Sequence, residues 1–264
     1  MSRPAAGCAA LVFALWVAGA SFGPAQDLPP GTLVLARTKA RVRQSLEHLP
    51  DCTCVENIQR FQKRPGRNEA MEPLDTLRLQ ILFSGDKELY LAPGTSQWES
   101  HPGTFIGRGM IGDGVFALHL KTVFTGGQAD FVYRGENSDF RPGLPHFDFR
   151  VPVMSSGYVL SSGSARGVAG IKGSVWINAE AFDVVRLEMH ADDIPPNVPF
   201  EEATTIIDYA RVRIGSADVL LPQTAVMATA SVNGQASRNV MEFSDCREFH
   251  ADSTVRFESA AGKP

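Results

Sequence analysis

The chain has 264 residues, of which 44% are hydrophobic and 20% charged, and its formal net charge is −4 at pH 7. A mildly acidic chain without clustered Lys and Arg argues against nucleic acid and anionic lipid surfaces as main partners. The length suits one large all-β domain with a substantial core, and no break in composition calls for a second domain.

Residues 1–25 have the layout of a secretory signal peptide. Arg3 precedes an apolar run from Cys8 to Ala20, and small residues follow. The run is too short to span a membrane, so we expect cleavage after Ala20 or Ala25 and no stable membrane span in the mature chain. Cleavage removes one basic and no acidic residue, so the 25 Lys and Arg become 24 against 29 Asp and Glu, a net charge of −5. We place the single domain at 26–257 and a flexible tail at 258–264.

Three of the four cysteines remain in the exported chain. An oxidising compartment favours one disulfide, and Cys52 and Cys54 are too close in sequence to pair without strain. We predict a bond between Cys54 and Cys246, which requires the first and last strands to be neighbours. Cys52 remains either a free thiol or the true partner of Cys246. A soft metal on the Cys-x-Cys pair is disfavoured, because no His or Met cluster lies nearby.

An amphipathic helix is predicted from Gly31 to Leu49, because apolar residues recur there at helical spacing and Pro50 ends the pattern. Its basic residues form either a solvated face on a helix over a sheet or a contact with an anionic membrane, and we favour the solvated face. These residues are Arg37, Lys39, Arg41 and Arg43. A strand from Thr53 to Phe61 follows.

The next predicted strand alternates apolar and polar residues from Leu77 to Phe83, and residues 88–92 return as a hairpin. Residues 93–114 form a glycine-rich loop that contains Gly107-Arg108-Gly109-Met110-Ile111-Gly112, a match to the dinucleotide-binding glycine pattern. That pattern binds a pyrophosphate only between a parallel strand and a helix of a βαβ unit. No strand–helix alternation surrounds it, so we expect no nucleotide and no cofactor.

Residues 114–124 fit either helical or strand spacing, and we favour a short helix set across the open side of a curved sheet. Strands are predicted at 128–134, 144–152, 158–162 and 167–172. From Gly173 to Phe249 the chain has the pattern of an antiparallel meander. Within it, alternation places Val185, Leu187 and Met189 on one dry face. Pro222 predicts an edge or a bulge in its strand.

Glu188, His190 and Asp192 occupy alternate positions of one strand and therefore share a face, as acid–base groups or metal ligands would. The solvated face of an antiparallel sheet has the same pattern, and we favour that interpretation. The chain has no Gly-x-Ser-x-Gly, His-Glu-x-x-His or phosphate-loop motif. We therefore predict no catalytic residue, no metal and no enzymatic activity.

The order of elements resembles the periplasmic lipoprotein-carrier superfamily, which includes outer-membrane lipoprotein-sorting domains. The resemblance is carried by the signal peptide, the amphipathic helix, the central short helix and the strand pair at 173–178 and 184–189. Residues 239–249 also resemble exported bacterial proteins of unassigned function. The chain departs from the superfamily in its cysteines, in the insertion at 93–114 and in lacking an equivalent of the carrier's functional arginine, so no site residue is transferred.

The resemblance implies a mainly β fold with few helices: a curved antiparallel sheet or incomplete β-barrel, with helices packed in or across its concave side. It also implies export to the periplasm or cell envelope of a Gram-negative-type bacterium and a lipid or acylated protein as ligand. The residues we expect to line the ligand are Leu77, Leu79, Ile81, Phe83, Val185, Leu187 and Met189. The alternative is a non-catalytic structural module that binds an envelope protein through an exposed strand edge. An enzyme is the third and least favoured class.

Overall fold

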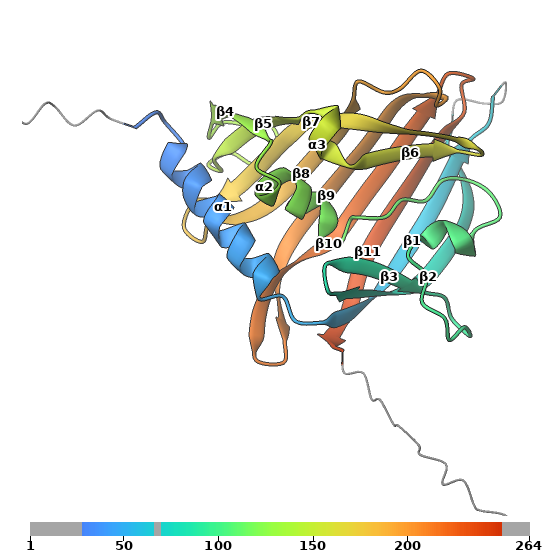
Figure 1. The fold of residues 1–264 in the computed structure, drawn as a ribbon, viewed down its shortest axis with the longest axis horizontal. Helices are drawn as coiled ribbons and strands as arrows, with labels where there is room; N and C mark the ends of the chain where they lie inside the picture. Colours follow the sequence, from blue (N-terminus) through green and yellow to red (C-terminus); the bar gives the residue numbers. More distant parts are fainter. Residues whose placement is uncertain (1–27, 66–69, 250–264) are drawn as a thin grey trace, which may run out of the picture.

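The computed structural model describes residues 28–65 and 70–249, and within them the chain forms one large curved sheet (Figure 1). The sheet has 11 strands, all its strand pairs are antiparallel, and it does not close into a barrel. The predicted class, a mainly β half-barrel with few helices, is confirmed. The predicted signal peptide and tail lie outside the described residues.

The helices and strands follow one another in chain order. They are α1 (Thr32–Glu47), β1 (Cys52–Lys63), β2 (Glu72–Ser84), β3 (Lys87–Leu91), the 3₁₀ turn η1 (Pro102–Phe105), α2 (Leu118–Thr125), β4 (Asp130–Gly135), β5 (His146–Val151), α3 (Val153–Ser156), β6 (Tyr158–Ser162), β7 (Ala165–Asn178), β8 (Asp183–Asp192), β9 (Phe200–Ile214), β10 (Ala217–Ser231) and β11 (Ala236–Glu248).

Neighbouring strands in space follow the order β3-β2-β1-β11-β10-β9-β8-β7-β5-β4, with β6 paired to β7. The strands β7 to β11 are consecutive in this order, so the predicted meander is present. The first strand, β1, pairs with the last, β11, along most of its length. This pairing of the first and last strands brings the two ends of the domain together in the middle of the sheet.

The two edges of the sheet differ. At one edge, Tyr90 of β3 exchanges two backbone hydrogen bonds with Glu99, at 2.7 and 2.8 Å, so the loop after β3 covers that strand. At the other edge, β4 has β5 as its one strand partner in the described part of the chain. Because β3 and β4 are joined by residues 92–129, this connection must run across the whole width of the sheet.

The helix α1 lies along the side of the sheet that carries α2 (Figure 1). It buries Val42 in the main core, while its basic residues reach the strands. Lys39 Nζ lies 4.5 Å from the ring centroid of Phe131, and Arg41 is 3.5 Å from the carboxylate of Asp183. Arg37 and Arg43 are exposed, as expected of a solvated face, whereas Lys39 and Arg41 hold the helix against β4 and the start of β8.

Local departures from the predicted pattern have identifiable causes. The register between β7 and β8 shifts at Trp176 and Ile177, so Val184 takes the buried position while Val185 is half-buried. A bulge breaks the alternation there, as an extra residue in one strand does. A second shift follows Pro222, where the sequence predicted an edge or a bulge. The short helix α3 was not predicted.

Gly173 in the middle of β7 offers a test of the packing between β7 and β8. An ideal Cβ atom at this position would lie 1.9 Å from the carbonyl oxygen of Glu188, a backbone atom that cannot rotate away. We expect Gly173→Ala to lower the free energy of unfolding by about 1–3 kcal/mol, measured by urea denaturation. Gly107→Ala is the matched control, because nothing lies within 4 Å of its ideal Cβ. Equal effects of the two substitutions would contradict the register at Gly173.

Candidate functional site

An uninterrupted row of apolar side chains crosses the concave face of the half-barrel. Cross-strand partners link one residue on each of nine strands, and no polar residue interrupts them. Every member belongs to the main core or packs against it. This set, called here the apolar row, consists of Tyr133, Phe147, Val175, Leu187, Ile207, Ala225, Met241, Ile58 and Leu77. Neighbouring strands lie roughly 4.8 Å apart, so the row spans roughly 38 Å.

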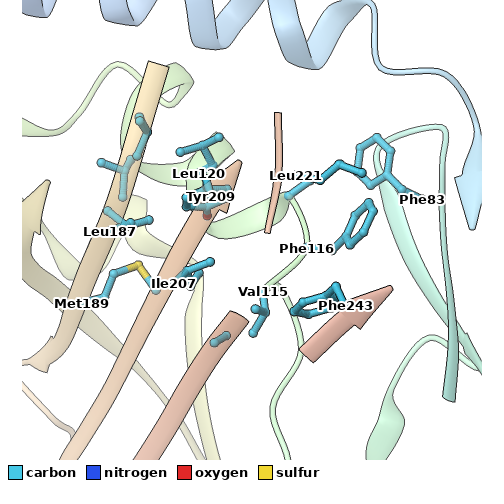
Figure 2. Packing of buried hydrophobic residues seen from close by; sticks show 14 of the residues in the cluster. Phe83, Val115, Phe116, Leu120, Leu187, Met189, Ile207, Tyr209, Leu221 and Phe243 are labelled. Carbon is cyan, nitrogen blue, oxygen red and sulfur yellow. The ribbon is translucent and has the colours of Figure 1, made fainter. Parts of the chain in front are cut away.

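The chain itself covers this row. Residues 106–117, called here the strap, cross the concave face and continue into α2. In the strap, Val115 and Phe116 are buried, and Leu120 of α2 joins the same core cluster. The ring of Phe116 lies 6.3 Å from that of Phe83 and 6.1 Å from that of Phe243 (Figure 2). The interior of the half-barrel is therefore filled by the chain's own residues.

Two polar side chains on the concave face of the sheet, called here the floor, hold the first half of the strap. Arg60, which is 2% exposed, donates through Nη1 to the carbonyl of Arg108 at 2.9 Å and binds Asp75 through its other nitrogens. Asn239 Nδ2 donates to the carbonyl of Met110, also at 2.9 Å. Arg60 and Asn239 are partners across β1 and β11, so both bonds come from one point of the floor.

A buried carboxylate, Glu88 of β3, holds the other end of the strap. It accepts hydrogen bonds from the backbone N–H groups of Gly114, Ala117 and Leu118 at 2.9, 2.8 and 3.1 Å, and from the Tyr90 hydroxyl at 2.9 Å. The residue that precedes α2 makes no side-chain cap of its own. Glu88 thus satisfies the free N–H groups at the start of α2 and places its negative charge at the positive end of that helix.

Further buried polar groups surround Glu88. Burial raises the pKa of Glu56 to about 8, and the Glu88 charge adds to the rise. Burial also raises the pKa of Glu88, against the opposing effect of its hydrogen bonds. Because Glu88 accepts four hydrogen bonds while Glu56 Oε2 has no partner, we assign the negative charge of this pair to Glu88. Burial lowers the pKa of His119 to about 4, so its imidazole is neutral near pH 7.

A cleft opens beside this group, between the end of α1, the β2–β3 hairpin and α2. It has a volume of about 600 Å³. Its apolar wall includes Phe83, the cross-strand partner of Glu88. We call it the mouth cleft, and its lining is Arg43, Leu46, Glu47, Leu49, Asp51, Phe83, Gly85, Asp86, Lys121 and Thr125. The cleft therefore ends at Phe83, which is the cross-strand neighbour of the buried Glu88.

The structure brings most of the predicted lining residues to the concave face. Leu79, Ile81 and Phe83 are buried in the core from the β2 side, and Leu77 packs against them. Leu187 and Met189 are buried in the same core from β8. Val185 stands apart at the bulge. Whether these residues contact a ligand stays a prediction.

The disulfide joins Cys54 to Cys246, as predicted, while Cys52 is a buried free thiol. Burial raises the pKa of the Cys52 thiol to about 12. At neutral pH this thiol is protonated and therefore a poor nucleophile.

Glu188, His190 and Asp192 lie on one strand but bind different neighbours. Asp192 pairs with Arg150 and Lys172 at 2.7 and 3.1 Å, and Glu188 lies 3.6 Å from Arg186. Within residues 28–65 and 70–249, no group of His, Cys, Asp and Glu is arranged to hold a metal ion. The glycine pattern at 107–112 lies in the strap, over an antiparallel sheet, without the βαβ surroundings that a dinucleotide requires.

Sequence reasoning missed both buried glutamates. Glu56 lies at an inward position of β1, between the buried residues Cys54 and Ile58. An acidic residue at an inward position of a strand could have been recognised from the sequence as a buried carboxylate. Glu88 carried no such signal, because its partners at 114–118 follow it by 26 to 30 residues. Contacts across that separation depend on the path of the strap.

Among the described residues, no helix is both long and apolar enough to cross a membrane. No family model matches the sequence, and no curated protein matches it. The chain is similar in structure to a LolA superfamily protein from Nitrosomonas europaea, with 15% identity, a TM-score of 0.41 and coverage of 82% of this chain and 94% of that one. It is also similar to a DUF1329 family protein from Desulfovibrio piger, with 13% identity, a TM-score of 0.44 and coverage of 86% and 96%.

Proposed function

We propose that the protein is an exported envelope protein that binds an apolar chain, such as a lipid acyl chain, along the apolar row. The observation that carries this proposal is the row itself. A floor of nine consecutive apolar residues offers a long chain uniform contact. Each methylene that leaves water contributes about 0.8 kcal/mol, and the apolar burial that the displaced strap residues lose offsets part of this gain.

The strap and α2, which cover the apolar row, can be displaced by a ligand. In the described chain, no residue from 100 to 129 pairs with the sheet as a strand; instead, side chains of the floor hold the strap. The apolar chain of the ligand enters at the mouth cleft and takes the place of Phe116 and Leu120 over the floor. The sheet keeps its hydrogen bonds throughout, so the cost of opening falls on the strap and α2.

The test is uptake of a neutral apolar probe, N-phenyl-1-naphthylamine, by a variant whose strap can be locked. Gly112 in the strap faces Met227 of β10, since an ideal Cβ at Gly112 would lie 2.0 Å from Met227 Cε. We expect Gly112→Cys with Met227→Cys to bind the probe when reduced and to lose at least ~10-fold in affinity when the new disulfide forms. The native protein with and without reductant is the control.

Native mass spectrometry of protein from its own envelope adds an independent readout, because a carrier retains lipid through mild purification. Absence of lipid together with absence of probe uptake by the native protein would reject the proposal. Recovery of one stoichiometric envelope protein in that case would support the structural module instead. Equal probe affinity in the locked and reduced states would place the site elsewhere.

A further inference from the structure

We propose that the polar end of the ligand is a primary ammonium group that docks on Glu56 and Glu88, an inference that rests on the proposed function. It concerns the chemistry of the head group, whereas the apolar row concerns the tail. Four observations carry it: the sign of the local charge, the unpartnered atoms, the number of donors and the position relative to the row.

A cluster of polar side chains lies at the end of the floor next to the mouth cleft, and its charge is negative. Its members are Glu56 of β1, Glu88 and Tyr90 of β3, Tyr209 of β9, Asp113 of the strap and His119 of α2. The charges that act on Glu56, Glu88 and the two tyrosines are carboxylates, and no Lys or Arg of the described residues is among them. Asp113 has a partner in the exposed His101, at 2.9 Å. The buried base of the floor, Arg60, is already paired with Asp75, so it does not neutralise Glu88.

Three atoms around this charge have no hydrogen-bond partner. They are Glu56 Oε2, the Tyr209 hydroxyl and His119 Nε2, on side chains of residues that are 2%, 7% and 8% exposed. Tyr209 rises from β9 toward Leu120 in the middle of the core (Figure 2). Each such buried group destabilises the closed structure while it is unsatisfied. A ligand that carries hydrogen-bond donors and positive charge would recover this cost.

The number of donors matches one chemical class. In the closed structure Glu88 accepts three backbone N–H groups from the strap and α2, and a primary ammonium also offers three N–H donors. A hydroxyl has one donor, and a carboxylate ligand would add negative charge to a buried acidic group. A metal ion is not a match, since the described residues contain no group arranged to hold one.

The position suits an amphiphile whose tail follows the apolar row. Glu56 is two residues from Ile58, a member of the row, so both side chains lie on the concave face. Phe83, the neighbour of Glu88, lines the mouth cleft. A head group at Glu56 and Glu88 therefore leaves the tail free to run inward over the floor.

The test compares single-chain amphiphiles with the same tail. Dodecylamine, dodecyltrimethylammonium, dodecanol and dodecanoate are titrated at pH 7 against protein loaded with N-phenyl-1-naphthylamine. We expect dodecylamine to displace the probe at a concentration at least ~10-fold below that of dodecanoate. Dodecyltrimethylammonium, which has charge but no N–H donor, should fall between them.

Glu88→Gln, which removes the negative charge of the pair, is expected to reduce this preference to less than ~3-fold. Glu56→Gln is expected to do the same, because it removes the carboxyl group that loses its proton when an ammonium ion docks beside it. The matched control is Glu242→Gln on the neighbouring strand β11, where the side chain is exposed; it should keep the full preference. If Glu88→Gln fails to fold, Glu56→Gln decides, because its Oε2 has no partner to lose. Equal displacement by all four compounds, or a preference for dodecanoate, would overturn the head-group assignment while the apolar site stands. Failure of the probe to bind native protein, together with absence of co-purified lipid, would overturn both.

Discussion

Removal of the Cys54–Cys246 disulfide is expected to lower the free energy of unfolding by about 5 kcal/mol. The bond joins residues 192 positions apart, and the stabilisation from a cross-link grows with the length of the loop that it closes. It also links β1 to β11, the pair through which the two ends of the domain meet. The measurement is urea denaturation of the native protein and of Cys54→Ala with Cys246→Ala, both without reductant.

The control for this comparison is Cys52→Ala, which removes a buried thiol two residues away but no bond. We expect it to lower the stability by less than half as much, and to leave the disulfide intact. Thiol labelling of unfolded, unreduced protein followed by peptide mapping should modify Cys52 and spare Cys54 and Cys246. Modification of all three would show that the bond is absent.

Raising the pH from 6.5 to 8 is expected to lower the free energy of unfolding by about 2 kcal/mol. The pKa of Glu56 rises from 4.5 to about 8 on folding, so the folded chain holds a proton that the unfolded chain releases. The stabilisation is complete below pH 4.5 and declines as the pH approaches 8, at about 1.4 kcal/mol per pH unit. Glu88, whose pKa is also raised by burial, acts in the same direction.

The pH range from 6.5 to 8 separates the contribution of Glu56 to stability from that of His119, because the two contributions change with pH in opposite directions. The pKa of His119 falls from 6.5 to about 4 on folding, so its contribution is complete above pH 6.5 and is lost as the pH falls toward 4. Urea denaturation at pH 6.5 and 8 therefore reports mainly on the carboxylates. Glu56→Gln should remove most of the decline, whereas Glu242→Gln should retain it. An unchanged decline in Glu56→Gln would show that another group titrates there.

Strand alternation was enough to predict much of the sheet. The apolar positions of β2 at Leu77, Leu79, Ile81 and Phe83 all face the core, since each strand residue must point to one of two faces. The distances that a disulfide permits excluded a Cys52–Cys54 bond, but they did not decide which of these two cysteines pairs with Cys246. Alternation failed at Val185, because a bulge depends on how β8 meets β7 rather than on the composition of β8 alone.

The candidate site was predicted less well than the fold. Alternation identifies a buried face, but a face packed by the chain itself and a face that holds a ligand have the same composition. The strap was recognised as a glycine-rich loop, yet its path over Arg60, Asn239 and Glu88 rests on contacts between residues 26 to 129 positions apart. These hydrogen bonds depend on the tertiary structure, and no local sequence pattern in this chain predicts them.

The unequal edges of the sheet limit how copies of this protein can associate through their backbones. The Tyr90–Glu99 hydrogen bonds occupy one position on the free side of β3, whereas β4 offers a second molecule an open ladder. A symmetric contact between the β4 edges of two molecules would use both of these ladders at once. The free side of β6, whose strand partner in the described chain is β7, would stay open in such a pair.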